Sequence, residues 1–354
     1  MLCAVEDLDA VTLTELLRHS PVTNGADVVS IERRRVGEGQ VAACWQLDLG
    51  LAGRDGTVGV VVKGPLTDPT SLATANALHL YEREVRFYEL VAPNVVIRTP
   101  TCFASSFDAT TGMFLLVLES MLPAAVSDQL VGLSAPLATL AVTELAGLHA
   151  PMWGEPSQAL SFADGVADSL RPLYDELLPG LFTGFLDRYG DQVTSPARSV
   201  IEWLIPRLGT YLAGRGGPQT VLHGDFRTDN LIFDGRGGTV PMATVDWQTV
   251  ARGCCALDLA YLLTTSLEPE VRRDQERELL ETYYDRLRTL GVVDYAAATL
   301  FDDYVWHAFQ GVVMLVCSAM LVVRTERGDA MFLTMIERGS VAVDDLDARA
   351  SWES

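Results

Sequence analysis

Residues 221–248 read VLHGDFRTDNLIFDGRGGTVPMATVDWQ, and this stretch decides how the rest of the chain is interpreted. Two apolar residues lead into the string HGD, which ends at Asp225, and Asn230 follows five positions later. Another apolar run, a Gly-rich turn at residues 234–238 and a second strand then lead to Asp246. The pattern predicts a short hairpin that brings Asp225, Asn230 and Asp246 together at one end.

Two carboxylates and an amide in this arrangement suit phosphoryl transfer. The loose transition state of that reaction needs an in-line nucleophile and cations on the phosphate oxygens, and little covalent help. Asp225 would take the proton of an acceptor hydroxyl, while Asn230 and Asp246 would hold Mg²⁺, which prefers oxygen ligands and phosphates. An ordinary surface hairpin is the alternative, because Asp, Asn and Gly are common in turns. Apolar strands beside both acidic positions favour the catalytic interpretation.

Lys63 is the single lysine in a chain whose Lys and Arg residues number 26. It ends a predicted strand, VGVVVK, and a compact ammonium suits a phosphate in a narrow slot better than a planar guanidinium does. Chance survival of one lysine is the alternative. Upstream, the turn GEGQ places Gly37 and Gly39 where backbone N–H groups can cover the phosphates of a nucleotide. In kinases such a lysine pairs with a glutamate on the next helix, which is predicted here at residues 71–90. Glu84 is the partner that the family resemblance described below implies, because it precedes an aromatic pair.

Two other glutamates on that helix, Glu82 and Glu89, are alternatives to Glu84 that could be solvated. Strands are expected at five places, which together predict a five-stranded sheet: residues 28–36, 44–49, 58–63, 95–102 and 113–118. Amphipathic helices are expected over most of the remainder, interrupted by Pro172, Pro179 and Pro206 in the middle of the chain. The clearest of them span residues 71–90, 137–149, 269–290, 301–324 and 329–346.

The string HGDFRTDN followed by VDWQ resembles the catalytic and metal-binding motifs of the aminoglycoside phosphotransferase and choline kinase superfamily. The Phe-Arg pair after HGD is most similar to the ecdysteroid-kinase-like (CHK-like) branch. The resemblance implies an α+β, bilobal, protein-kinase-like fold. Residues 1–120 would form a nucleotide-binding lobe with a five-stranded antiparallel sheet and a helix. Residues 121–354 would form a larger, mainly helical lobe for catalysis and acceptor binding.

The resemblance also implies roles for individual residues. Glu119 and Met121 belong to a predicted hinge whose backbone would bind the base of ATP. Arg227 stands two positions after the catalytic aspartate, where a cation near the γ-phosphate is expected; pairing with Asp229 or Asp246 is its alternative. Asp258, in the string GCCALDLA, would brace the catalytic loop by accepting backbone hydrogen bonds.

These features together predict an ATP- and Mg²⁺-dependent phosphotransferase acting on a hydroxyl group of a small molecule, such as a sugar, aminoglycoside, steroid or polyketide-type alcohol. A catalytically silent nucleotide-binding module is the alternative, and GTP is an alternative donor. Protein kinases are disfavoured, because the loop reads HGD instead of HRD, the metal motif reads DWQ instead of DFG, and no APE string closes an activation segment.

Composition limits the partners. A net charge of −21 argues against nucleic acid, because phosphate backbones require a basic surface. No cysteine spacing fits a zinc site, and no basic leader precedes an apolar run, so we expect a cytoplasmic protein, monomeric or homodimeric. The most apolar window, residues 312–323, is too short to cross a bilayer and indicates a buried helix.

Overall fold

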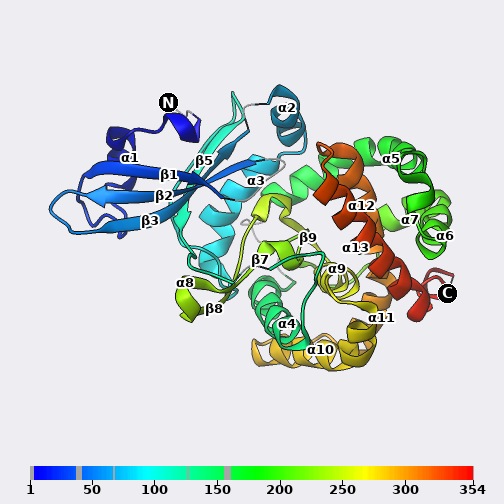
Figure 1. Cartoon of the computed structure of the whole chain (residues 1–354). Coiled ribbons are helices and arrows are strands. Elements are labelled where there is room, and N and C mark those ends of the chain that lie inside the picture. The colour runs from blue at the N-terminus through cyan, green and yellow to red at the C-terminus, as the bar shows by residue number, and fades with distance from the viewer. Residues whose placement is uncertain (1–3, 37–41, 67, 126, 155–160, 354) are drawn as a thin grey trace. The chain divides into compact units, whose positions relative to one another are not determined.

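The computed structural model describes residues 4–36, 42–66, 68–125, 127–154 and 161–353 (Figure 1). They form two compact units, each built from three segments of the chain. Unit 1 comprises Met1–Pro93, Thr99–Ala124 and Asp234–Gln248, and unit 2 comprises Asn94–Arg98, Ala125–Phe233 and Thr249–Ser354. The end of the second segment, at Ala124, lies near the lobe boundary predicted at residue 120. However, Asp234–Gln248 is part of unit 1.

A five-stranded antiparallel sheet forms the main part of unit 1, as the sequence predicts (Figure 1). Its order is β1-β2-β3-β5-β4, with the bounds β1 Val28–Arg35, β2 Ala42–Leu51, β3 Thr57–Pro65, β4 Cys102–Asp108 and β5 Met113–Glu119. Val60 and Val62 of β3 point into an apolar core that helix α1 (Ala10–Leu17) covers. Because side chains alternate along a strand, Lys63 points to the opposite face.

The strand expected at residues 95–102 is wrong, because β4 begins only at Cys102. A proline cannot donate to a strand ladder; Pro93 precedes the expected segment and Pro100 lies inside it. Its residues Asn94–Arg98 instead belong to unit 2, where the backbone N–H of Val96 donates to the carbonyl of Gly147.

The helix expected at residues 71–90 is interrupted. Helix α2 (Pro69–Ala77) stops before His79, whose φ of 54° is left-handed, and α3 (Leu80–Arg86) then begins in a new direction. A π-helical turn, Phe87–Val91, follows directly. The break sets the helical phase of α3 and so decides which of its glutamates is buried.

A tight turn docks the third segment of unit 1 onto the chain after β5. This turn, α8 (Gly235–Gly238), contains left-handed residues and precedes β8 (Val240–Thr244). The N–H of Arg236 donates to the carbonyl of Met121, and the N–H of Gly237 donates to the carbonyl of Pro123. These bonds connect the hairpin predicted from the HGD stretch to the predicted hinge.

Unit 2 is mainly helical around α9 (Ala256–Ser266), in which every residue except Leu257 is buried. Its other helices are α4 Ala135–His149, α5 Ser161–Tyr189, α6 Ser195–Leu204, α7 Leu208–Ala213, α10 Pro269–Thr289, α11 Ala297–Trp306, α12 Gln310–Leu321 and α13 Glu326–Asp345. Short strands β6 (Thr220–Leu222) and β9 (Ala251–Gly253) pair with each other, and β7 spans Leu231–Asp234. The α+β class is confirmed.

The interruptions expected at Pro172 and Pro179 are wrong, because α5 runs through both positions as one helix. Each proline removes one N–H donor, but its fixed φ is close to the helical value, so the hydrogen bonds on either side can continue. The run Ala297–Leu321 is long and apolar enough to cross a membrane by length and composition. Because 72% of its most apolar window is buried, it has the character of a core helix, as expected for residues 312–323.

Candidate active site

The ammonium of Lys63 lies between two carboxylates of unit 1. Its Nζ is 2.6 Å from Oε2 of Glu84 and 2.7 Å from Oδ1 of Asp246. The Lys63 side chain is 8% exposed and that of Glu84 is 1% exposed, whereas Asp246 keeps 31% of its side-chain surface open. Asp246 is therefore the member of this trio that a ligand can reach most easily.

The charges of the trio depend on one another. Burial disfavours the ammonium, but the carboxylates of Asp246 and Glu84 outweigh it and hold the pKa of Lys63 well above its usual value. Burial raises the pKa of Glu84, against the opposing attraction of Lys63. Lys63 is thus a permanent cation.

Only one of the three candidate glutamates contacts Lys63. Glu84 makes the pair, whereas Glu82 faces His79 and Arg86 on the helix surface. Glu89 accepts hydrogen bonds from Arg86 and from Ser105. The phase of α3 explains the difference, because it turns Glu84 inward and leaves the other two beside solvent.

Asp246 is fixed by its backbone and by its neighbour. Its φ of 67° is left-handed, a conformation that Asp adopts more readily than most residues. The next residue, Trp247, is fully buried and stacks on Phe87, with ring centroids 3.7 Å apart and an interplanar angle of 6°. Since Phe87 lies three residues after Glu84, one aromatic stack positions both carboxylates that contact Lys63.

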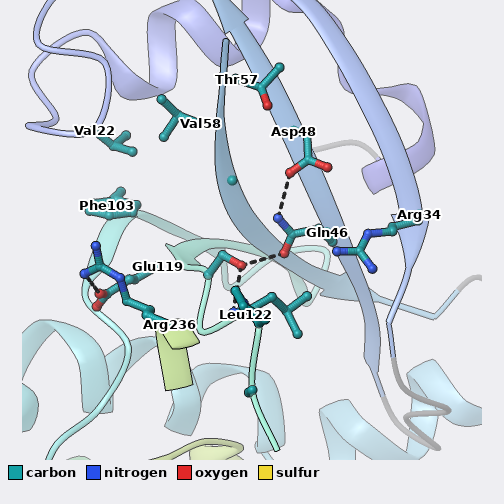
Figure 2. A pocket seen from close by; sticks show the side chains of 14 residues that line it. Val22, Arg34, Gln46, Asp48, Thr57, Val58, Phe103, Glu119, Leu122 and Arg236 are labelled. Atoms are coloured by element: carbon teal, nitrogen blue, oxygen red, sulfur yellow. Dashed lines mark hydrogen bonds and ion pairs between the residues drawn. The ribbon is translucent and has the colours of Figure 1, made fainter. Parts of the chain in front are cut away.

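The predicted hinge lines a cavity of about 740 Å³ in unit 1 (Figure 2). Glu119 forms an ion pair with Arg236, 2.9 Å between Oε1 and Nη1, and accepts hydrogen bonds from Thr101. Across the cavity, the Gln46 amide accepts from the Ser120 hydroxyl and donates to Asp48 (Figure 2).

The hinge backbone is partly committed to other bonds. The N–H of Glu119 donates to the carbonyl of Thr101, and the carbonyl of Met121 accepts from the N–H of Arg236. Neither Lys63 nor Met121 is among the residues that line the cavity. Gly37 and Gly39, expected above the phosphates, lie outside the described residues.

In unit 2, three donors surround the carboxylate of Asp225. The Asn230 amide donates to its Oδ2 at 2.9 Å and to its backbone carbonyl at 2.8 Å. The Nε of Arg227 lies 3.2 Å from the same carboxylate, and the Tyr261 hydroxyl donates to Oδ1 at 2.9 Å. Because Asn230 uses its N–H groups for these bonds, its amide oxygen remains the atom suited to a cation.

Arg227 also contacts Asp229, with 3.0 Å between Nη1 and Oδ2. Of the two carboxylates that the sequence offers as its partners, Asp229 and Asp246, this is the first. Burial opposes its charge, but Asp225 and Asp229 raise the pKa of Arg227 above its usual value. Burial also opposes the charge of Asp229, yet Arg227 lowers the pKa of that carboxyl.

Asp258 holds the backbone of the HGD loop. Its two oxygens accept from the N–H groups of His223, at 2.6 Å, and Gly224, at 2.9 Å. His149 is fully buried and contacts both Asp258 and the Tyr283 hydroxyl, which fits a structural histidine. Gly224 has a φ of 81°, and a Cβ there would stand 2.4 Å from the carbonyl oxygen of Thr249. The loop therefore requires glycine at this position.

The expected convergence of Asp225, Asn230 and Asp246 stays a prediction, because the first two belong to unit 2 and the third to unit 1. Within the described part of the chain, no group of three His, Cys, Asp or Glu side chains is placed to hold a metal ion. That finding concerns acidic and soft ligand clusters, and a site built from one carboxylate and one amide lies outside it.

The sequence interpretation missed two contributors, Trp247 and Tyr261. Trp247 had a signal, since an aromatic residue directly after a proposed ligand can pack beneath it. Tyr261 follows Asp258 by three positions, which places both on one face of a helix. That spacing relates Tyr261 to Asp258, but it does not by itself show that Tyr261 contacts Asp225.

Comparison with known proteins identifies the family of the chain. The sequence model of the ecdysteroid kinase-like family matches residues 37–295 of the chain. The chain belongs to that family. This confirms the ecdysteroid-kinase-like branch predicted from the strings HGDFRTDN and VDWQ. No curated protein matches the chain.

Solved structures resemble the ecdysteroid kinase-like chain over almost its whole length. A choline kinase from Cryptosporidium parvum has a TM-score of 0.56 at 11% identity, covering 97% of this chain and 99% of its own. This likeness confirms the kinase-like fold. A microcompartment-associated aminopropanol kinase has a TM-score of 0.48 at 15% identity, with coverages of 97% and 98%. The GDP complex of aminoglycoside 2'-phosphotransferase-IIIa has a TM-score of 0.49 at 14% identity, with coverages of 94% and 99%.

Proposed function

We propose that this ecdysteroid kinase-like chain is an ATP- and Mg²⁺-dependent phosphotransferase that acts on a hydroxyl group of a small molecule. One observation carries the proposal: the only lysine of the chain is buried as a cation between Glu84 and Asp246. A buried ion pair is costly unless it is well paired, and replacement by apolar residues is often neutral or stabilising. A role in binding phosphate explains why the charge is retained.

In unit 1, Lys63 would contact the nucleotide phosphates, and Glu84 would hold its ammonium in place. A compact ammonium acts as a point charge for a phosphate oxygen. The cavity beside Glu119 and Ser120 supports a place for the remainder of a nucleotide in this unit.

In unit 2, Asp225 would orient the acceptor hydroxyl and remove its proton. Its carboxylate is 21% exposed, so it remains accessible while its donors fix its orientation. Arg227 would stabilise negative charge on the transferred phosphoryl group, because its guanidinium is already beside Asp225.

The donor chemistry of two residues fits Mg²⁺. Asp246 offers a carboxylate whose side chain is 31% exposed, and Asn230 offers its amide oxygen, because its amide N–H groups already donate to Asp225. Mg²⁺, when bound by them, would neutralise the phosphate oxygens of the donor.

The acceptor would be an alcohol with little positive charge. Asp229, the acidic neighbour of Asp225, is neutralised by Arg227 and lies 3.4 Å from Arg327. Asp128 is paired with the same Arg327, at 3.0 Å. Steroid, polyketide and sugar alcohols therefore fit better than polycationic aminoglycosides, although the structures named above include kinases of amino alcohols and aminoglycosides.

The direct test is a mass-spectrometric screen of hydroxylated metabolites and antibiotics with ATP, GTP and Mg²⁺, in which a gain of one phosphoryl group reports transfer. Asp225→Ala is the matched control: it should bind nucleotide nearly as the wild type does and transfer nothing. Transfer at the wild-type rate by Asp225→Ala would contradict the assigned base. Nucleotide binding without transfer to any acceptor would indicate a catalytically silent module.

A further inference from the structure

We propose that Tyr261 is a positioning residue for Asp225, and that its hydroxyl fixes the orientation in which the carboxylate meets the acceptor. This inference rests on the function proposed above. It starts from the bond between the Tyr261 hydroxyl and Oδ1 of Asp225, 2.9 Å long. Both residues lie in unit 2 and come from different elements, the HGD loop and helix α9.

The two oxygens of Asp225 have different surroundings. Oδ2 accepts from Asn230, and the Nε of Arg227 lies 3.2 Å from both oxygens; both residues belong to the same loop as the aspartate. Oδ1 is bound by Tyr261 from a buried helix outside the loop. A side chain held only by its own loop can move together with that loop. A hydrogen bond to the buried helix α9 instead fixes the carboxylate relative to the core of unit 2.

Helix α9 supports this loop at two points. Asp258 accepts the N–H groups of His223 and Gly224, immediately before the catalytic aspartate. Tyr261, three residues further along the same helix, holds the carboxylate itself. Backbone and side chain of the base are therefore fixed from one face of one helix, which is the arrangement that a preorganised catalytic group requires.

The hydroxyl can act only as a donor to this carboxylate. Tyr261 is 2% exposed, and burial, followed by the charge of Asp225, raises the pKa of its phenol well above the usual value. It therefore keeps its proton at every pH at which the enzyme would work.

The chemical consequence concerns proton transfer. A carboxylate can rotate, and Arg227, whose Nε is equally near both oxygens, does not favour one orientation over the other. With Oδ1 held by Tyr261 and Oδ2 by Asn230, the plane of the carboxylate is set before the acceptor arrives. Loss of the Tyr261 hydroxyl should therefore reduce kcat and leave binding of ATP unchanged.

The experiment compares Tyr261→Phe with Tyr304→Phe in the full-length protein. Tyr304 is a matched control, because its buried hydroxyl donates to a carboxylate too, Oε2 of Glu276, at 2.6 Å. With ATP, Mg²⁺ and water as acceptor, release of inorganic phosphate gives kcat and the KM for ATP. Tyr261→Phe should lower kcat about 10-fold without changing that KM, whereas Tyr304→Phe should change neither. 4-Aminophenylalanine at position 261, which restores a donor, should recover part of kcat.

A second measurement does not depend on activity. 3-Fluorotyrosine at position 261 should show a ¹⁹F resonance that shifts when Asp225 is replaced by Asn, and 3-fluorotyrosine at position 304 should not respond. An unshifted resonance, an unchanged kcat for Tyr261→Phe, or an equal loss in Tyr304→Phe would each overturn the inference. A wild-type protein that binds ATP but transfers to neither water nor any screened acceptor contradicts the proposed function, and the catalytic role of Tyr261 falls with it.

Discussion

Lys63 Nζ donates a 2.7 Å hydrogen bond to Oδ1 of Asp246, across 183 residues of sequence. Their pairing joins the third strand of the sheet to the segment that carries the proposed metal ligand. Because the aromatic stack of Phe87 and Trp247 lies beside it, the pair is held on both sides by buried groups. The first two predictions follow from this contact.

Lys63→Arg should lower kcat/KM about 100-fold although the charge is unchanged. A guanidinium is larger and planar, so it cannot present one compact charge to Glu84, Asp246 and a phosphate in the same volume, and misplacement of this kind carries losses of that order. Steady-state kinetics on the acceptor found by the screen would measure it. Arg54→Lys, in an exposed loop of the same unit, is the control and should have no effect. Full activity of Lys63→Arg would make the single lysine a coincidence.

Asp246→Asn should weaken the Mg²⁺-dependent part of nucleotide binding roughly 10- to 100-fold, the loss typical of a damaged metal site. Asn tolerates the left-handed backbone at this position, so the variant keeps the local backbone and removes the negative charge that pairs with Lys63. Calorimetric titration of nucleotide with and without a chelator would isolate the effect. Asp55→Asn serves as an exposed control. If the chelator still weakens binding to Asp246→Asn as much as to the wild type, Asp246 is not a ligand.

Asp229→Asn should destabilise the protein by about 2 kcal/mol at pH 7, because Asp229 accepts from Arg227 and from the N–H of Gln129. The pKa of Asp229 is lower in the folded chain than its usual 3.8. The unfolded chain therefore binds this proton more readily, and the stabilisation is present above pH 3.8 and lost as the pH falls through the folded value. Urea unfolding at several pH values should show the difference between variant and wild type shrinking in acid. A difference independent of pH would refute this.

Gly224→Ala should cost more stability than Gly214→Ala. Both glycines have left-handed φ values, 81° and 71°, so both variants incur backbone strain of about 1 kcal/mol or more. A Cβ at Gly224 also meets the Thr249 carbonyl, whereas one at Gly214 meets nothing within 4 Å. The difference between the denaturant midpoints of the two variants would separate the clash with Thr249 from the backbone strain that both share. Turnover should fall only in Gly224→Ala, since its loop carries Asp225. Equal losses would show that the close approach does not matter.

The sequence was sufficient to predict those features that depend on the order of motifs along the chain. The five-stranded sheet was predictable from the strand patterns, and the kinase-like fold from the resemblance of the HGDFRTDN and VDWQ strings to a known superfamily. The sequence was insufficient where the phase of a helix decides which side chain is buried. Nothing in YEREVRFYEL states that Glu84 turns inward, because the left-handed residue His79 sets that phase from outside the string.

Other misses have the same origin in long-range contacts. The expected strand at residues 95–102 has ordinary β-propensity, but Val96 bonds to Gly147 in unit 2 instead. Tyr261 resembles any apolar residue of a buried helix until the bond to Asp225 is known. Pattern analysis finds elements, and it does not find partners that are far apart in sequence.

Because unit 1 is built from three separate segments of the chain, it cannot be expressed whole as one contiguous piece. Expression of a contiguous piece that ends at Ala124 would supply the whole sheet and yet omit Asp234–Gln248. Such a piece would carry a buried ammonium deprived of one of its two counter-ions, and an aromatic ring, Phe87, with no stacking neighbour. Gene splitting at the obvious midpoint should therefore produce an unstable product, whereas fusing residues 234–248 back onto it by a linker should restore solubility.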